Sequence, residues 1–149
     1  MSILKVGCLQ LKLNKTNNIE HIIQSIDKAY KDCPKLDLIV LSELAVGGAG
    51  AKDSEHTLDK YVNLFSKIAK DKSIWLIPGS FYEKVNDKIY NTAPVFNPDG
   101  KLVTKAKKIY PWLPYEENVN SGSNICVFNI PNKGIIGIHI CYDLWFPET

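Results

Sequence analysis

The sequence predicts an α/β fold in which one mixed β-sheet carries two helices on one face. Near the N-terminus two apolar segments flank an amphipathic one, which is the order of a parallel strand–helix–strand unit. A second amphipathic segment follows, and short turns join several of the remaining apolar segments. The last of these, residues 134–141, is uncharged and rich in isoleucine, which is typical of a strand buried on both faces.

The N-terminal unit is predicted from its periodicity. Residues 3–11 read as a buried first strand. A helix capped by Asn17 or Asn18 follows and ends before Pro34, because isoleucines recur on one of its faces at helical spacing. Residues 37–42 are a second apolar strand, which we expect to run parallel to the first.

A loop and a second helix are predicted next. The segment Gly47-Gly48-Ala49-Gly50 lacks the glycine spacing of phosphate-binding loops and is expected to be a flexible connection. A helix from about residue 54 to residue 71 then presents an apolar stripe to the core.

The rest of the chain is predicted to be mainly strands and turns. Five further strands are expected, at residues 74–82, 89–96, 101–108, 125–130 and 134–141. Residues 85–88 form a turn, and Asn97-Pro98-Asp99-Gly100 is a strong hairpin signal. Pro147 cannot continue a strand but suits the first turn of a helix.

Composition restricts the class of protein. The 149 residues form a single domain, with 45% hydrophobic and 23% charged residues, as in an ordinary globular protein. A net charge of +2 excludes an electrostatic nucleic-acid or membrane binder. All 18 basic residues are lysine, so the chain offers no guanidinium group for bidentate recognition of carboxylates.

The four cysteines indicate reduced thiols and no metal. Cys8 is expected to fill the core, and no pair among Cys8, Cys33, Cys126 and Cys141 has metal-ligand spacing. No H-E-x-x-H sequence occurs either, so we expect neither a metal nor another cofactor. The sequence shows no signal peptide and no membrane-spanning apolar run, which favours a cytoplasmic protein.

Three chemically distinct side chains stand at the ends of predicted strands. Glu43 follows the second strand, Lys108 ends the fifth, and Cys141 ends the last. Strand ends gather ligands and nucleophiles in α/β sheets, so a carboxylate, an ammonium and a thiol can meet at one edge.

The segments around these residues resemble motifs of a known family. Leu41-Ser42-Glu43, Lys107-Lys108-Ile109 and Cys141-Tyr142-Asp143 are similar to the glutamate, lysine and cysteine motifs of the nitrilase superfamily of carbon–nitrogen hydrolases. The run 108–116 resembles the aliphatic amidase and formamidase branch, in which Glu116 matches an additional glutamate.

The resemblance covers essentially the whole chain, with departures. Ser42 replaces a frequent proline, Trp145 stands where many members have arginine, and Glu117 replaces a glycine. The chain stops where the family's second half should begin, so residues 1–149 are expected to be one truncated domain. The resemblance implies one half of an α-β-β-α sandwich.

The resemblance also implies a chemistry. Cys141 would attack a small non-peptide amide, Glu43 would act as the base, and the products would be an acid and ammonia, formed through a thioester. Lys108 and the backbone N–H of Tyr142 would stabilise the oxyanion, and Glu116 would orient Lys108 or the substrate. Family members that hydrolyse nitriles or N-carbamoyl compounds use the same three residues, so the substrate stays open.

Two alternatives remain. His139 and Cys141, two residues apart on a strand, would face the same side and could form a papain-like pair, although no orienting asparagine is evident. The chain could also be a truncated, non-catalytic remnant or an assembly module. The apolar last strand, residues 134–141, needs covering on both faces. Apolar surface that stays exposed there leads us to expect a homo-oligomer.

Overall fold

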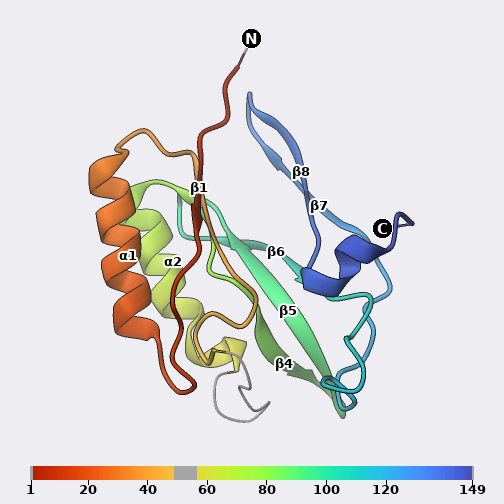
Figure 1. Ribbon diagram of the computed structural model, residues 1–149. Coiled ribbons are helices and arrows are strands. Elements are labelled where there is room, and N and C mark those ends of the chain that lie inside the picture. Colours follow the sequence, from red (N-terminus) through yellow and green to blue (C-terminus); the bar gives the residue numbers. More distant parts are fainter. Residues whose placement is uncertain (1, 49–56, 149) are drawn as a thin grey trace.

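The computed structural model describes residues 2–48 and 57–148, and its ribbon shows two helices packed side by side against a twisted sheet (Figure 1). The α-helices are α1 (Ile19–Asp32) and α2 (Val62–Lys72). Two short 3-10 helices accompany them, η1 (Leu58–Lys60) and η2 (Cys141–Trp145). The eight strands are β1 (Val6–Leu9), β2 (Leu38–Leu41), β3 (Trp75–Ile77), β4 (Phe81–Val85), β5 (Lys88–Phe96), β6 (Leu102–Lys107), β7 (Cys126–Ile130) and β8 (Gly134–Ile138).

Six strands form the mixed sheet that the sequence predicts, with the order β1-β2-β3-β5-β4 and with β6 also paired to β5. β1, β2 and β3 are parallel, because helical connections return the chain to the same end of the sheet. β4, β5 and β6 are antiparallel and are joined by the two predicted turns, at residues 85–88 and 97–100. Both confirmed turns are short enough to connect neighbouring antiparallel strands.

The core on the helix side of the sheet is sealed. It joins both helices to β2, β3 and the start of β4, and its largest members are fully buried. These include Ile22, Ile26, Ile39, Phe65, Leu76, Phe81 and Phe96. The predicted apolar faces of both helices are therefore buried against the sheet, as is typical of amphipathic helices.

The predicted strand 74–82 is wrong as a single strand. Pro78 has no backbone N–H to continue a ladder, and Gly79 adopts φ +83°. A Cβ at Gly79 would lie 2.2 Å from the carbonyl oxygen of Ser42, so only glycine permits this close approach. The chain thus breaks between β3 and β4, and the break lies against the segment that carries Glu43.

The predicted burial of the first strand is also wrong. β1 covers only Val6–Leu9 and pairs with β2 alone among the described strands, so it is an edge strand. Val6 is 42% exposed, and Cys8 is an exposed thiol rather than core filler.

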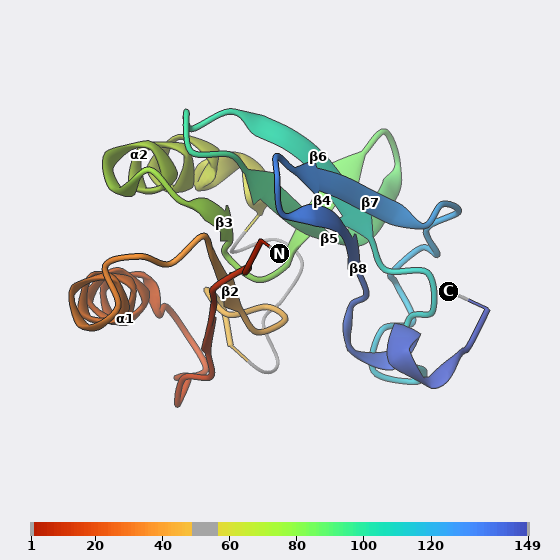
Figure 2. The ribbon, with the colours of Figure 1, turned by 90° about the horizontal axis from the view of Figure 1, so that it is seen from above.

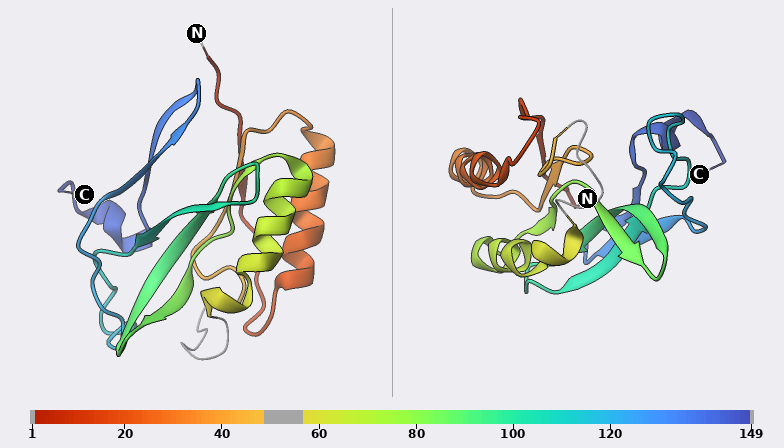
Figure 3. Two further views of the ribbon diagram at one scale, coloured as in Figure 1. Left: turned by 180° about the vertical axis from the view of Figure 1, so that it is seen from behind. Right: turned by 90° about the horizontal axis from the view of Figure 1, so that it is seen from below.

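The largest correction concerns the last two strands. β7 and β8 form a separate two-stranded antiparallel sheet and do not join the mixed sheet. This hairpin lies on the side of the mixed sheet opposite to α1 and α2 (Figures 2 and 3). Its inner side chains pack with Val95 and Ala93 in a second core, whereas Ile135 on its outer face is 74% exposed. The predicted burial of β8 on both faces is therefore wrong, because one face is partly buried and the other is exposed.

Smaller differences occur at helix ends. Asn18 precedes α1, but its side chain bonds Asn14 and the Val46 carbonyl instead of capping the helix. Of the two predicted caps it is Asn17 whose side-chain oxygen accepts the N–H of Ile19, the first residue of α1, at 3.0 Å. The second helix begins at Val62, and the predicted residues 54–56, like Ala49 and Gly50, lie outside the described residues. The helical turn near the C-terminus is η2, which precedes Pro147 rather than starting at it.

In the described ranges, no helix is long and apolar enough to cross a membrane.

Candidate active site

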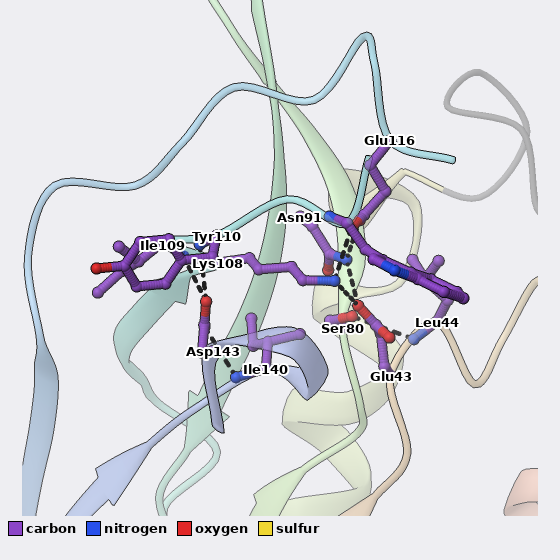
Figure 4. A network of polar contacts seen from close by, with 11 residues as sticks. Glu43, Leu44, Ser80, Asn91, Lys108, Ile109, Tyr110, Glu116, Ile140 and Asp143 are labelled. Carbon is purple, nitrogen blue, oxygen red and sulfur yellow. Dashed lines mark hydrogen bonds and ion pairs between the residues drawn. The ribbon is translucent and has the colours of Figure 1, made fainter. Parts of the chain in front are cut away.

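The three residues predicted at strand ends lie at one end of the mixed sheet. Glu43 lies two residues after the end of β2, in a turn, Lys108 directly follows β6, and Cys141 opens η2 after β8. Glu43 and Cys141 line the same cavity of about 210 Å³, whose other walls are mostly aliphatic residues of β2, β3 and β8. The structure therefore brings the carboxylate and the thiol to one cavity. The Lys108 ammonium lies beside the Glu43 carboxylate (Figure 4).

Lys108 is the centre of the polar network. Its side chain is almost completely buried, and its Nζ donates to Glu43 Oε1 at 2.8 Å and to Glu116 Oε2 at 2.6 Å. Burial alone would lower the pKa of Lys108, but the hydrogen bonds and charges of the two carboxylates outweigh it and raise the pKa above its ordinary value. Lys108 is thus a fixed cation at neutral pH.

Glu116 lies at the end of the proline-rich loop and is held by three donors. Besides Lys108, the Trp112 N–H donates to its Oε2 at 2.7 Å, and the Asn91 side chain donates to its Oε1 at 2.9 Å. Burial would raise the pKa of Glu116, yet these donors together lower it. The predicted contact between Glu116 and Lys108 is present in the structure.

The turn after β2 fixes the backbone of Glu43. The N–H of Leu44 donates to Ser80 Oγ at 3.1 Å, and Leu44 adopts a left-handed φ of +50°. Ser80 is buried at the break between β3 and β4, directly after Gly79. The strand break that the sequence pattern did not indicate is therefore what anchors the candidate base.

Cys141 also has a left-handed backbone, with φ +51°, a conformation that non-glycine residues rarely adopt. Such backbones cluster at functional sites. Burial raises the pKa of the Cys141 thiol, and the charge and hydrogen bond of Glu43 raise it further, against the opposing charge of Lys108. The raised pKa means that a nucleophilic role for Cys141 would require transfer of its proton to a base.

Asp143 holds the two loops of the site together. It is buried, and its Oδ1 accepts the N–H groups of Ile109 and Tyr110 at 3.0 and 2.8 Å. Its Oδ2 accepts the N–H of Ile140 at 3.0 Å. One carboxylate thus ties the residues after Lys108 to the turn that presents Cys141. Asp143 belongs to the predicted cysteine motif, but no role was predicted for it. The feature that could have indicated one is its position two residues after a thiol at the end of a strand.

Asn91, in the middle of β5, was missed altogether. Its side-chain amide contacts both Glu43 and Glu116, and the residue is fully buried. The sequence feature that could have indicated a role for Asn91 is an asparagine within an otherwise strand-forming segment, because asparagine is depleted in strands.

The other predicted positions are less central. Tyr142 follows Cys141 in η2 and its ring packs edge-on against Phe146 at 5.3 Å; the role of its backbone N–H stays a prediction. His139 is exposed on the wall of the cavity that Glu43 and Cys141 also line, and its pairing with Cys141 stays a prediction. Trp145 is 79% exposed.

Among residues 2–48 and 57–148, no group of three or more histidine, cysteine, aspartate or glutamate side chains could hold a metal ion.

Comparison with known proteins extends these observations. Residues 5–149 match the carbon–nitrogen hydrolase family. The chain is 34% identical to nitrilase homolog 2 of Dictyostelium discoideum, covering 91% of this chain and 45% of that protein. It is 29% identical to a formamidase of Bacillus cereus strain B4264, with 97% of this chain and 46% of that protein covered.

The fold is likewise similar to solved structures. A carbon–nitrogen hydrolase from Helicobacter pylori G27 superposes with a TM-score of 0.82 at 28% identity, covering 97% of this chain and 53% of that one. The chain spans about half the length of the curated relatives named above. The family match over residues 5–149 shows that the chain belongs to the carbon–nitrogen hydrolase family.

Proposed function

We propose that the protein hydrolyses the C–N bond of a small non-peptide amide to a carboxylic acid and ammonia, through a thioester on Cys141. The observation that carries this proposal is that the buried Lys108 ammonium bonds Glu43 and Glu116, and that Glu43 lines one cavity together with Cys141. Similarity to a formamidase supports an amide as the substrate.

In the proposed reaction Glu43 takes the proton of the Cys141 thiol as the sulfur attacks the amide carbon. The carbonyl oxygen becomes an oxyanion, which Lys108 Nζ and the N–H of Tyr142 stabilise. Two of the three Lys108 N–H donors bond the carboxylates, so the third is assigned to this oxygen. The C–N bond breaks, and protonated Glu43 gives its proton to the leaving ammonia.

The second half of the reaction regenerates the thiol. Glu43 removes a proton from water as the water oxygen attacks the thioester carbon. The C–S bond breaks, the acid leaves, and the proton returns to the Cys141 sulfur. The protonated resting thiol requires a base in the first half of the reaction, and the attacking water requires one in the second. The Glu43 carboxylate serves as the base in both halves.

We also propose a cytoplasmic, self-associating protein. All four cysteines are free, which fits a reducing compartment, and apolar side chains remain exposed on the β7–β8 hairpin. The alternative of a non-catalytic assembly module is less favoured, because the relatives named above include an enzyme of this family and the polar network is assembled.

Ammonia release from acetamide, acetonitrile and an N-carbamoyl amino acid tests the proposal and separates the three substrate classes. We expect release from acetamide, and a loss of at least about 10²-fold for Cys141→Ala, Glu43→Gln and Lys108→Ala. The assay is run on this chain and on the longest natural polypeptide that contains it.

The matched control is Lys107→Ala. The Lys107 ammonium lies over the Tyr90 ring, 3.8 Å from its centroid, and takes no part in the network around Glu43. The Lys107→Ala variant should leave turnover within about twofold, as substitutions away from such a network usually do. Normal turnover by Lys108→Ala, or by Cys141→Ala, would contradict the proposed roles.

A further inference from the structure

Asn91 presents an unusual arrangement in the middle of β5. Its Nδ2 donates to Glu43 Oε1 at 2.8 Å and to Glu116 Oε1 at 2.9 Å (Figure 4). A side-chain amide has only two N–H donors, so each is used on a different carboxylate. Asn91 is therefore a bridge between the candidate base and the carboxylate that holds Lys108.

The orientation of this amide follows from its partners. Rotating it by 180° would place the carbonyl oxygen against two carboxylates, which accept but cannot donate when ionised. In the orientation that satisfies both carboxylates, Oδ1 is buried and lacks a hydrogen-bond partner within the described residues. Leaving a buried acceptor unpaired is unfavourable. The Asn91 amide thus keeps its two hydrogen bonds to Glu43 and Glu116, while its Oδ1 accepts none within the described residues.

The charges around Asn91 explain what these bonds do. Glu43 approaches from the turn after β2, Glu116 from the loop before β7, Lys108 from the end of β6, and Cys141 from η2. Two carboxylates share one ammonium, so the cluster carries a net charge of −1 with the thiol protonated. Neighbouring carboxylates repel one another, and an amide that donates to both of them offsets this repulsion and holds them in place.

We propose that Asn91 is a positioning residue, which holds the Glu43 carboxylate oriented toward Cys141. Nδ2 and Lys108 Nζ both bond Glu43 Oε1, so Oε2 is the oxygen assigned to the thiol proton. This inference rests on the proposed function, because it gives Glu43 the role of base. Asn91 itself does not touch the reacting atoms.

Three variants test it. Asn91→Leu removes both donors at similar volume, Asn91→Asp keeps the shape but adds a third carboxylate, and Thr92→Val is the matched control. Thr92 is the next residue of β5, equally buried, and its hydroxyl bonds Glu83 on the opposite face of the sheet. A loss that merely reflected damage to β5 would appear in all three variants.

Steady-state ammonia release gives the first readout. For Asn91→Leu we expect kcat to fall about 10–100-fold with KM nearly unchanged, as for a misplaced catalytic group. Thr92→Val should change neither quantity.

Alkylation of Cys141 by iodoacetamide, followed across pH by peptide mapping, gives a readout that needs no turnover. Asn91→Asp should move the alkylation midpoint to higher pH, because a further negative charge disfavours the thiolate. An unmoved midpoint in Asn91→Asp together with an unchanged kcat in Asn91→Leu would overturn the role of Asn91 while leaving the proposed function intact. If the wild-type protein releases no ammonia while Asn91→Asp still shifts the midpoint of Cys141 alkylation, the proposed function is overturned instead.

Discussion

The two faces of the mixed sheet differ in how completely they are covered. On one face α1 and α2 bury a core whose members, including Ile26 and Phe65, are fully inaccessible. On the other face the β7–β8 hairpin covers a second core, but its own outer side chains Val127 and Ile135 are 56% and 74% exposed. The covered face provides stability, whereas the cavity of Glu43 and Cys141 lies on the open one.

This difference separates two requirements. A helix seals a sheet face by itself, because its outer surface is polar. A two-stranded hairpin with apolar residues on both faces buries one face and exposes the other, which favours association with further protein surface. The candidate active site is thus built where the fold leaves room for a ligand or a partner.

The largest expected effect compares the same substitution on the two faces. Ile26→Ala should lower the free energy of unfolding by about 2–5 kcal/mol, because it opens a cavity in the sealed core. Ile135→Ala on the outer face of the hairpin should change it by about 0.5 kcal/mol or less. Urea titrations of both variants at low protein concentration measure the difference. Equal losses would mean that the hairpin is as well covered as the helix face.

A smaller effect concerns self-association. Val127→Lys places a charge on the exposed face of β7 and should raise the dissociation constant of the self-associated protein about tenfold or more, equivalent to about 1.4 kcal/mol. Light scattering over a concentration series provides the measurement. The control is Val103→Lys, since Val103 is 38% exposed on β6 but lies outside the hairpin. If both variants behave alike, the hairpin is not the associating surface.

The smallest effect is a change in pH dependence. The pKa of Glu116 is lowered in the folded chain, so its contribution to stability is present above its unfolded pKa and is lost as the pH falls through the folded value. Glu116→Gln should therefore flatten the decline of the free energy of unfolding on the acidic side. Lys108 has a raised pKa and acts oppositely, because its contribution is lost only as the pH rises through that value.

The control for that titration is Glu117→Gln. Glu117 is the adjacent residue and is exposed, so its removal should leave the acidic decline unchanged. Unfolding measured by circular dichroism from neutral to acidic pH distinguishes the two variants. An unchanged slope in Glu116→Gln would show that the buried ion pair does not contribute to acid sensitivity.

The sequence by itself determined the order and type of most elements. Helical spacing of isoleucines predicted α1, and the turn residues at 85–88 and 97–100 predicted the connections of β4, β5 and β6. Residues at strand ends also identified Glu43, Lys108 and Cys141. These features are local in the chain, so periodicity and turn chemistry are sufficient to find them.

Only the tertiary structure decided what each element faces. An uncharged strand such as β8 has the same sequence pattern whether one of its faces or both are covered. Its place in a separate hairpin could therefore not be predicted from the sequence. The break at Gly79 and the bridge made by Asn91 depend on residues more than twenty positions away in the chain. The direction of the Cys141 pKa likewise depends on burial and on the balance between Glu43 and Lys108, which exists only after the strand ends have converged.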